Sequence, residues 1–183
     1  MELVTFTRMD EGTREDYQLA KVEEDAMIAN FPDKVLEWLK EMDVPSVYQV
    51  TRYEHSLQAA TRAHRAGEDE EMVVAALLHD LGDILAPANH SEVAAAMLRP
   101  YVTDRVYWII KHHGLFQGYY YNHHHNEDRN LRDRFRDHQW YNDTVRFCAD
   151  YDQVSFDPEF DSEPIEFFKP MVRRVLSTPT YVQ

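Results

Sequence analysis

The stretch Ala75–Asp83 (AALLHDLGD) constrains the fold of this chain more than any other. The residues before His79 are small or apolar, which predicts a helix that is buried on most of its surface, and Gly82 is a typical residue for ending it. An imidazole and a carboxylate at the buried end of a helix, here His79 and Asp80, are costly unless they are paired or bind a metal. The sequence therefore predicts that further polar residues complete a site around this pair.

The composition favours one compact helical domain. The chain has 183 residues, of which 44% are hydrophobic and only five are glycine. Its single cysteine, Cys148, excludes an internal disulfide and fits a reducing compartment. We find no signal-peptide pattern and no run near ~20 apolar residues, so we expect a soluble, cytoplasmic protein without membrane contacts. A formal charge of −14 argues against binding nucleic acid, although metal ions would still allow an anionic substrate.

Helical patterns cover most of the sequence, and no strand alternation is visible. A capping box at Thr51–Glu54 predicts a helix start there. We expect the segment 114–130 to be a long connection, of the kind that forms lids or site walls. We assign residues 1–45 to an N-terminal helical extension packed on the core and residues 46–183 to the main domain. The expected helices span residues 15–30, 33–42, 51–66, 69–79, 89–99, 103–113, 131–137, 143–153 and 165–176.

Candidate metal ligands recur near the middle or end of these helices. Imidazole and carboxylate groups without thiolate suit iron, manganese, zinc, cobalt or nickel. Six such side chains exceed what one ion takes from a protein while keeping an open position, so two ions bridged by Asp80 is the economical interpretation. Isolated histidines such as His64 and His138 are not assigned as ligands. The candidates are His55, His79, Asp80, His90, His112 or His113, and Asp150.

The order of these residues resembles the HD-domain superfamily, an all-helical fold of metal-dependent phosphohydrolases. His90 and His112 resemble the additional ligands of its dinuclear branch. Within that branch, Glu54–Ala59 (EHSLQA) and Met72–Gly82 (MVVAALLHDLG) are similar to the mixed-valent diiron oxygenases. These include myo-inositol oxygenase and the enzymes that cleave the carbon–phosphorus bond of 1-hydroxyalkylphosphonates. The resemblance implies an all-α fold, a single HD-domain helical bundle with a dinuclear metal site in its core.

The resemblance also implies how the ligands are divided between the two ions. His55, His79, Asp80 and Asp150 would bind one metal, and Asp80 would bridge to a second that is held by His90 and His112. His112 is preferred to His113 because it directly follows Ile109–Lys111, where the helix of the family delivers its ligand. Asp150 is preferred to Asp152 because an aspartate followed by an aromatic residue, here Tyr151, matches the family pattern.

Four further residues are candidates for catalysis or substrate binding: Tyr48, Arg52, Lys111 and Gln117. A helix would place Tyr48 and Arg52 on the face of His55, where the guanidinium can clamp an anionic group and the phenol can cover an open coordination position. The structural alternatives are a surface ion pair for Arg52 and ordinary packing for Tyr48. Lys111 adjoins a ligand. The phosphonate enzymes carry a lysine four residues beyond the second-metal histidine, and Phe116 or Gln117 replaces it here, depending on the register.

Two enzyme classes fit this ligand set. The resemblance favours a diiron oxygenase with Fe(II)/Fe(III) that uses O₂ to cleave a C–P or C–C bond of a small hydroxylated, phosphonate-like substrate. The alternative is a phosphohydrolase that uses manganese or another divalent ion on a phosphomonoester or nucleotide. A non-catalytic HD module that binds a nucleotide or a protein partner is a third hypothesis. The ligands alone do not separate the first two.

Overall fold

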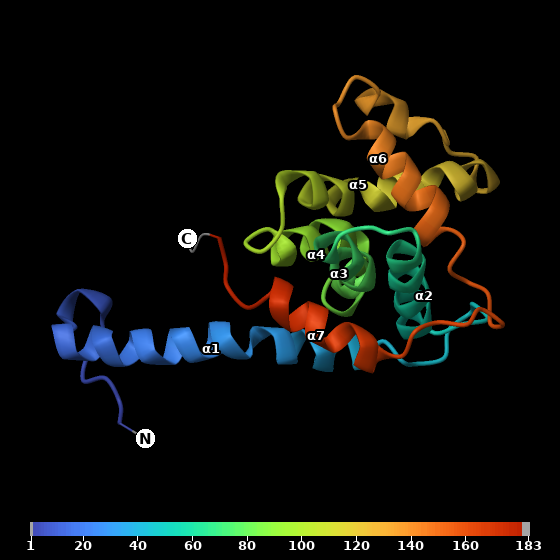
Figure 1. The fold of residues 1–183 in the computed structure, drawn as a ribbon. Helices are drawn as coiled ribbons and strands as arrows, with labels where there is room; N and C mark the ends of the chain where they lie inside the picture. Colours follow the sequence, from blue (N-terminus) through green and yellow to red (C-terminus); the bar gives the residue numbers. More distant parts are fainter. Residues whose placement is uncertain (1, 181–183) are drawn as a thin grey trace.

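The structure, a computed structural model, describes residues 2–180, and every regular element in that range is helical (Figure 1). The predicted all-α fold is therefore confirmed. None of the described helices combines the length and the apolar character that crossing a lipid bilayer requires. The main helices are α1 (Arg14–Glu41), α2 (Arg52–Arg65), α3 (Glu70–Leu78), α4 (His90–Leu98), α5 (Asp104–Tyr121), α6 (Tyr141–Arg146) and α7 (Ile165–Val175). The short ones are η1 (Met9–Glu11), η2 (Leu81–Ile84), η3 (Pro87–Asn89), η4 (Asn122–His125), η5 (Leu131–Phe135) and the π-helical turn η6 (Phe147–Asp152).

Helix α3 forms the centre of the core. All residues from Met72 to Leu78 are buried, and the helix packs against α2, α5 and α7 (Figure 1). Burying a leucine such as Leu77 or Leu78 completely contributes roughly 1.5–3 kcal/mol relative to leaving it exposed. This packing fixes the C-terminal end of α3, where His79 and Asp80 follow.

The start of α2 is fixed by the predicted capping box. The hydroxyl of Thr51 accepts a hydrogen bond from the backbone N–H of Glu54, and the carboxylate of Glu54 accepts one from the backbone N–H of Thr51. These bonds satisfy two N–H groups that a helix start otherwise leaves unpaired. They set the register in which Arg52 and His55 occur on the first two turns of α2.

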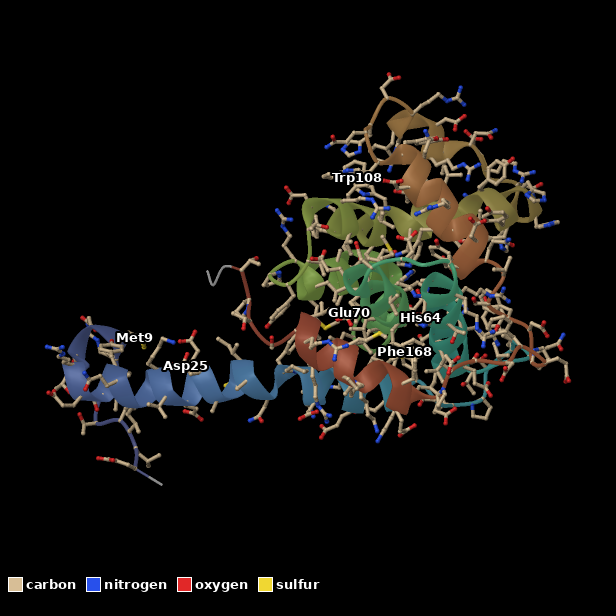
Figure 2. All side chains as sticks on the ribbon, viewed as in Figure 1. Met9, Asp25, His64, Glu70, Trp108 and Phe168 are labelled. Atoms are coloured by element: carbon tan, nitrogen blue, oxygen red, sulfur yellow. The ribbon has the colours of Figure 1, made fainter. Side chains whose placement is uncertain are left out.

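The N-terminal residues form one long helix instead of the two expected over 15–30 and 33–42. Helix α1 continues through Pro32, although a proline removes one helical hydrogen bond and crowds the preceding turn. Val35, Leu36 and Leu39 beyond it are buried in the core, which anchors the second half of the helix. The first half extends away from the rest of the molecule (Figure 1), and Figure 2 shows Asp25 on this part of the helix, remote from the other helices. The domain division at residue 45 stays a prediction.

Helix α5 continues eight residues beyond the predicted end at His113, so the first part of the expected connection is helical. Gly114 and Gly118 do not end the helix. A Cβ at residue 114 would lie 2.5 Å from the Oγ of Ser91, and one at residue 118 would lie 2.8 Å from the Nδ2 of Asn122. These glycines therefore allow neighbouring side chains to approach α5 closely.

Gly82, within η2, likewise allows a close approach, here between η2 and the start of α4. A Cβ at this position would lie 2.1 Å from the carbonyl oxygen of His90, which no side chain tolerates. The contact of η2 with the start of α4 brings His90 towards Asp80.

Candidate metal centre

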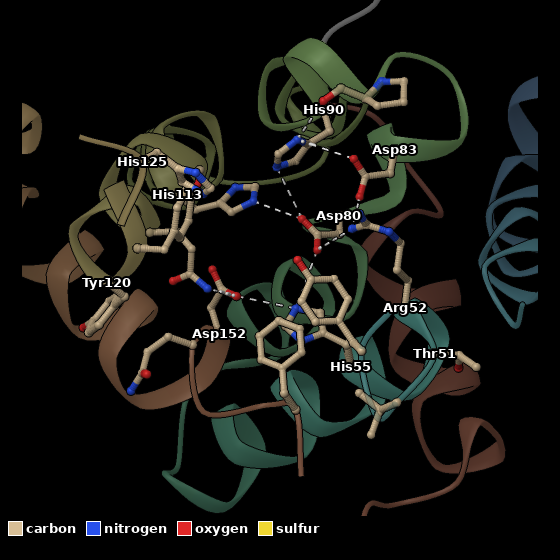
Figure 3. A pocket seen from close by; sticks show the side chains of 18 residues that line it. Thr51, Arg52, His55, Asp80, Asp83, His90, His113, Tyr120, His125 and Asp152 are labelled. Carbon is tan, nitrogen blue, oxygen red and sulfur yellow. Dashed lines mark hydrogen bonds and ion pairs between the residues drawn. The ribbon is translucent and has the colours of Figure 1, made fainter. Parts of the chain in front are cut away.

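Asp80 lies at the centre of a cavity of about 580 Å³ (Figure 3). The cavity is formed by the first turns of α2 and α4, the segment after α3, the second half of α5 and the segment that follows α6. Figure 3 shows His90 and His113 pointing towards Asp80, and Asp152 facing His55, from these different elements. Helices that are far apart in the sequence therefore deliver one cluster of imidazole and carboxylate groups.

One half of the cluster contains His55, His79 and Asp152. The Nε2 atoms of His55 and His79 are 3.1 Å apart, and they lie 3.5 and 3.7 Å from Oδ1 of Asp152. Oδ2 of Asp80 lies 3.6 Å from His55 Nε2 and 3.5 Å from His79 Nε2. Ligand atoms of His55, His79 and Asp152 all lie within 4.8 Å of one another, so one ion can contact all three.

The other half contains His90 and His113. The Nε2 atoms of these residues lie 3.4 and 3.2 Å from Oδ1 of Asp80. The two carboxylate oxygens of Asp80 thus face two different groups of histidines. This is the arrangement of a carboxylate that can bridge two ions.

The hydrogen bonds of the imidazoles orient their free nitrogen atoms for binding a cation. The Nδ1–H of each ring donates to a backbone carbonyl, at 2.9 Å for His55, 2.8 Å for His79, 2.6 Å for His113 and 3.3 Å for His90. In the neutral tautomer this leaves the Nε2 lone pairs directed at the centre, as in metal-binding histidines. The facing Nε2 atoms of His55 and His79 then repel each other unless a cation lies between them.

Two buried oxygen atoms beside the cluster also lack a hydrogen-bond donor. They are Oδ2 of Asp152 and Oε1 of Gln117. A bound cation would satisfy such oxygen atoms.

The electrostatics of the cluster favour positive charge at His79. Burial alone lowers the pKa of His79, but the carboxylates of Asp80 and Asp152 outweigh it and raise this pKa to about 9. Burial raises the pKa of both carboxyls, yet the neighbouring imidazoles hold the pKa of Asp80 and of Asp152 well below its ordinary value. A metal ion that binds here therefore displaces a proton from His79.

The expectation that His112 faces this centre is corrected to His113. The ring of His112 packs on Trp108, with 3.8 Å between centroids, and its Nδ1–H donates to the Trp108 carbonyl at 2.9 Å. His113 is buried and belongs to the apolar face of α5, four residues after Ile109 and seven after Val106. Successive helix residues point about 100° apart, so this spacing was the signal in the sequence that selects His113.

The expectation for Asp150 is corrected to Asp152. The Asp150 side chain is exposed, whereas Asp152 is buried beside His55 and His79. These aspartates lie in the π-helical turn η6, where the N–H of Gln153 bonds to the carbonyl of Cys148 at 3.0 Å, five residues back. A π turn changes which residues face the core, and such turns are common at functional sites. The α-helical period in the sequence does not reveal it.

Three of the four predicted substrate residues line the cavity: Tyr48, Arg52 and Gln117. Nη1 of Arg52 forms an ion pair with Asp83 and lies 3.8 Å from Oδ2 of Asp80. The amide of Gln117 donates to Oδ1 of Asp152 at 2.9 Å, so it holds a residue of the cluster in place.

Lys111 is the exception, and its expected place beside the site is corrected. Its ammonium group lies 5.9 Å from the ring centroid of Tyr107, and Lys111 does not line the cavity. Lys111 was expected beside the site because it adjoins His112, but His112 itself packs on Trp108, away from the cluster.

Phe156 is a cavity residue for which the sequence gives no signal. Its ring stacks on His55, with 4.5 Å between centroids and an interplanar angle of 28°, and it lies 5.0 Å from the ring of Tyr48. It follows η6 in a segment without helical periodicity, so its position could not be derived from spacing.

A helical core and a buried centre built around an adjacent His–Asp pair define a class of metal-binding helical domains. The family model described as HD domain matches residues 52–145, and the chain belongs to this family. Members of the family are usually metal-dependent enzymes. A comparison with curated proteins gave no match. The family-level prediction is thus confirmed, and the assignment to the oxygenase subgroup stays a prediction.

Proposed function

We propose that this chain is a dinuclear iron oxygenase of the HD-domain type. It would use O₂ to cleave a C–P or C–C bond of a small hydroxylated, anionic substrate. The proposal of two ions rests on the position of Asp80. Its Oδ2 faces His55 and His79, and its Oδ1 faces His90 and His113. The nitrogen and oxygen donors suit iron. Two irons, when bound, would supply O₂ activation and a Lewis-acidic anchor for the substrate hydroxyl.

Arg52 is the residue that we expect to bind the anionic group of the substrate. Its side chain is 43% exposed and reaches the cavity beside Asp80. The ion pair with Asp83 orients the guanidinium, and the remaining N–H groups can donate to a phosphonate or a carboxylate. Asp83 thereby positions Arg52 for substrate.

Other residues of the chain shape the centre and its access to water. Gln117 fixes the carboxylate of Asp152 through its hydrogen bond. Phe156 covers His55, and Tyr48 packs on Phe156 at the more exposed side of the cavity. These aromatic rings restrict water around the reacting groups, which strengthens polar interactions inside the cavity.

The charges in the cavity favour a small substrate over a nucleotide. Among the described residues that line the cavity, Arg52 is the one Lys or Arg side chain, beside the carboxylates of Asp80, Asp83 and Asp152. A polyphosphate would leave most of its charge without a protein cation, whereas one phosphonate or carboxylate group can be held by Arg52 and the metal centre. This supports a small, singly anchored substrate.

Oxygen uptake tests the proposed reaction. Protein reconstituted with Fe(II) without air is exposed to O₂ together with 1-hydroxyalkylphosphonates and polyols, one at a time. We expect O₂ consumption in proportion to product for at least one compound, and a mixed-valent EPR signal that the same compound shifts. Hydrolysis of phosphomonoesters with manganese, without O₂ uptake, would instead identify a phosphohydrolase with the same dinuclear centre.

A further inference from the structure

Two arginines outside the metal cavity share one aromatic ring. The Cζ atoms of Arg129 and Arg132 lie 4.0 and 3.6 Å from the ring centroid of Tyr119. Tyr119 belongs to the last turns of α5, Arg132 to η5, and Arg129 to the connection before η5. The two guanidinium groups are therefore within about 8 Å of each other. Neither residue lines the metal cavity.

Neither guanidinium forms an ion pair with a carboxylate among the described residues, although the chain carries a formal charge of −14. After the hydrogen bond from Tyr141, the charge of Arg132 contributes to lowering the pKa of Asp133, but the two groups are not in ion-pair contact. The nearby Asp133 is occupied by the hydroxyl of Tyr141 at 2.7 Å and by Arg136 at 2.5 Å. Other arginines of the molecule, such as Arg105 with Asp143 at 2.9 Å, do have such partners.

The guanidinium edges also contain unused hydrogen-bond donors. Nε of Arg129 and both Nε and Nη1 of Arg132 are buried and have no hydrogen-bond partner. Stacking on Tyr119 uses the faces of the guanidinium groups and leaves these N–H donors free. A buried donor without an acceptor is costly, and such donors are normally satisfied. An acceptor with negative charge would satisfy both the donors and the charge.

We propose that Arg129, Arg132 and Tyr119 form a binding site for a tetrahedral oxyanion such as phosphate, separate from the metal centre. Guanidinium groups bind phosphate oxygens through paired N–H donors, and two of them match a doubly charged anion. The site adjoins the cavity wall, because Tyr120, next to Tyr119, lines the cavity. Arg132 also opposes the rise that burial causes in the pKa of the Tyr120 phenol, as expected for a neighbouring cation.

Titration with inorganic phosphate tests this site in the full chain. Isothermal calorimetry compares the wild type with the double variant Arg129→Gln/Arg132→Gln. The matched control is Arg134→Gln, since Arg134 lies on the same η5 segment but contacts Phe135, at 4.8 Å, instead of Tyr119. We expect the double variant to lose at least tenfold in phosphate affinity and the control to bind like the wild type. Wild-type affinity in the double variant would assign the phosphate to the metal centre and overturn the proposal, and so would an equal loss in the control.

A second measurement uses the unmodified chain, so that it does not depend on the folding of a variant. In ¹⁵N-labelled wild-type protein, phosphate should shift the Nε–Hε resonances of Arg129 and Arg132 in a saturable manner and leave that of Arg134 unchanged. Resonances of Arg129 and Arg132 that do not respond to phosphate would contradict the site.

Discussion

Replacing Asp80 with alanine is expected to remove both metal ions and to reduce turnover by at least about a thousandfold. Its two oxygens face both halves of the histidine cluster, so neither half keeps a complete set of ligands. Because the proposed ions would supply the Lewis acid and the reactive centre, losing them would remove the main catalytic contribution. Metal analysis and steady-state turnover of the purified variant measure both effects.

The matched control for this variant is Asp150→Ala. Asp150 is an exposed carboxylate on η6 that does not reach the cluster, so its loss should leave metal content and turnover unchanged. Circular dichroism verifies that both variants fold. An Asp80→Ala protein that kept two ions and full turnover would refute the role of Asp80 as the bridge.

The adjacent histidines of α5 provide the second large contrast. His113→Ala is expected to lose the second ion, which His90 and His113 would hold. Turnover should fall by more than roughly 100-fold, which is the upper range for losing a residue that only supports a ligand. His112→Ala should keep both ions. It should lose the ring contacts with Trp108 and Phe135 and the hydrogen bond to the Trp108 carbonyl, together about 1–3 kcal/mol of folding stability. Metal analysis, turnover and chemical denaturation of the two variants separate these outcomes.

The opposite pattern would overturn the corrected register of α5. If His112→Ala lost an ion and His113→Ala retained both, His112 would be the ligand, as the family resemblance indicated. Equal losses in both variants would indicate general unfolding of α5 instead of a ligand effect.

The parts of the fold that follow simple local rules could be predicted from the sequence. The apolar run into His79 indicated the buried α3, and the capping box located the start of α2. Both features depend on burial and on hydrogen bonds between residues close in sequence. The buried His–Asp pair indicated only that partners were needed. The choice of His55 and His90 as partners came from the resemblance to the HD-domain superfamily.

The errors have identifiable physical causes. His112 was preferred because it directly follows Ile109–Lys111, as the family resemblance implies, whereas the 3.6-residue period of the buried face selects His113. Asp152 depends on a π turn, which no apolar period encodes. The segment from Gly114 was expected to be a connection, but α5 continues to Tyr121, and close contacts with Ser91 and Asn122 explain its two glycines. Such features depend on residues distant in the chain or on unusual backbone geometry.

The number of irons per chain tests the central claim most directly. Protein reconstituted with Fe(II) without air and freed of excess metal is analysed by mass spectrometry for iron and by amino-acid analysis for protein. A carboxylate that bridges two groups of imidazoles predicts two irons per chain. One iron per chain, or none, would contradict a dinuclear centre around Asp80.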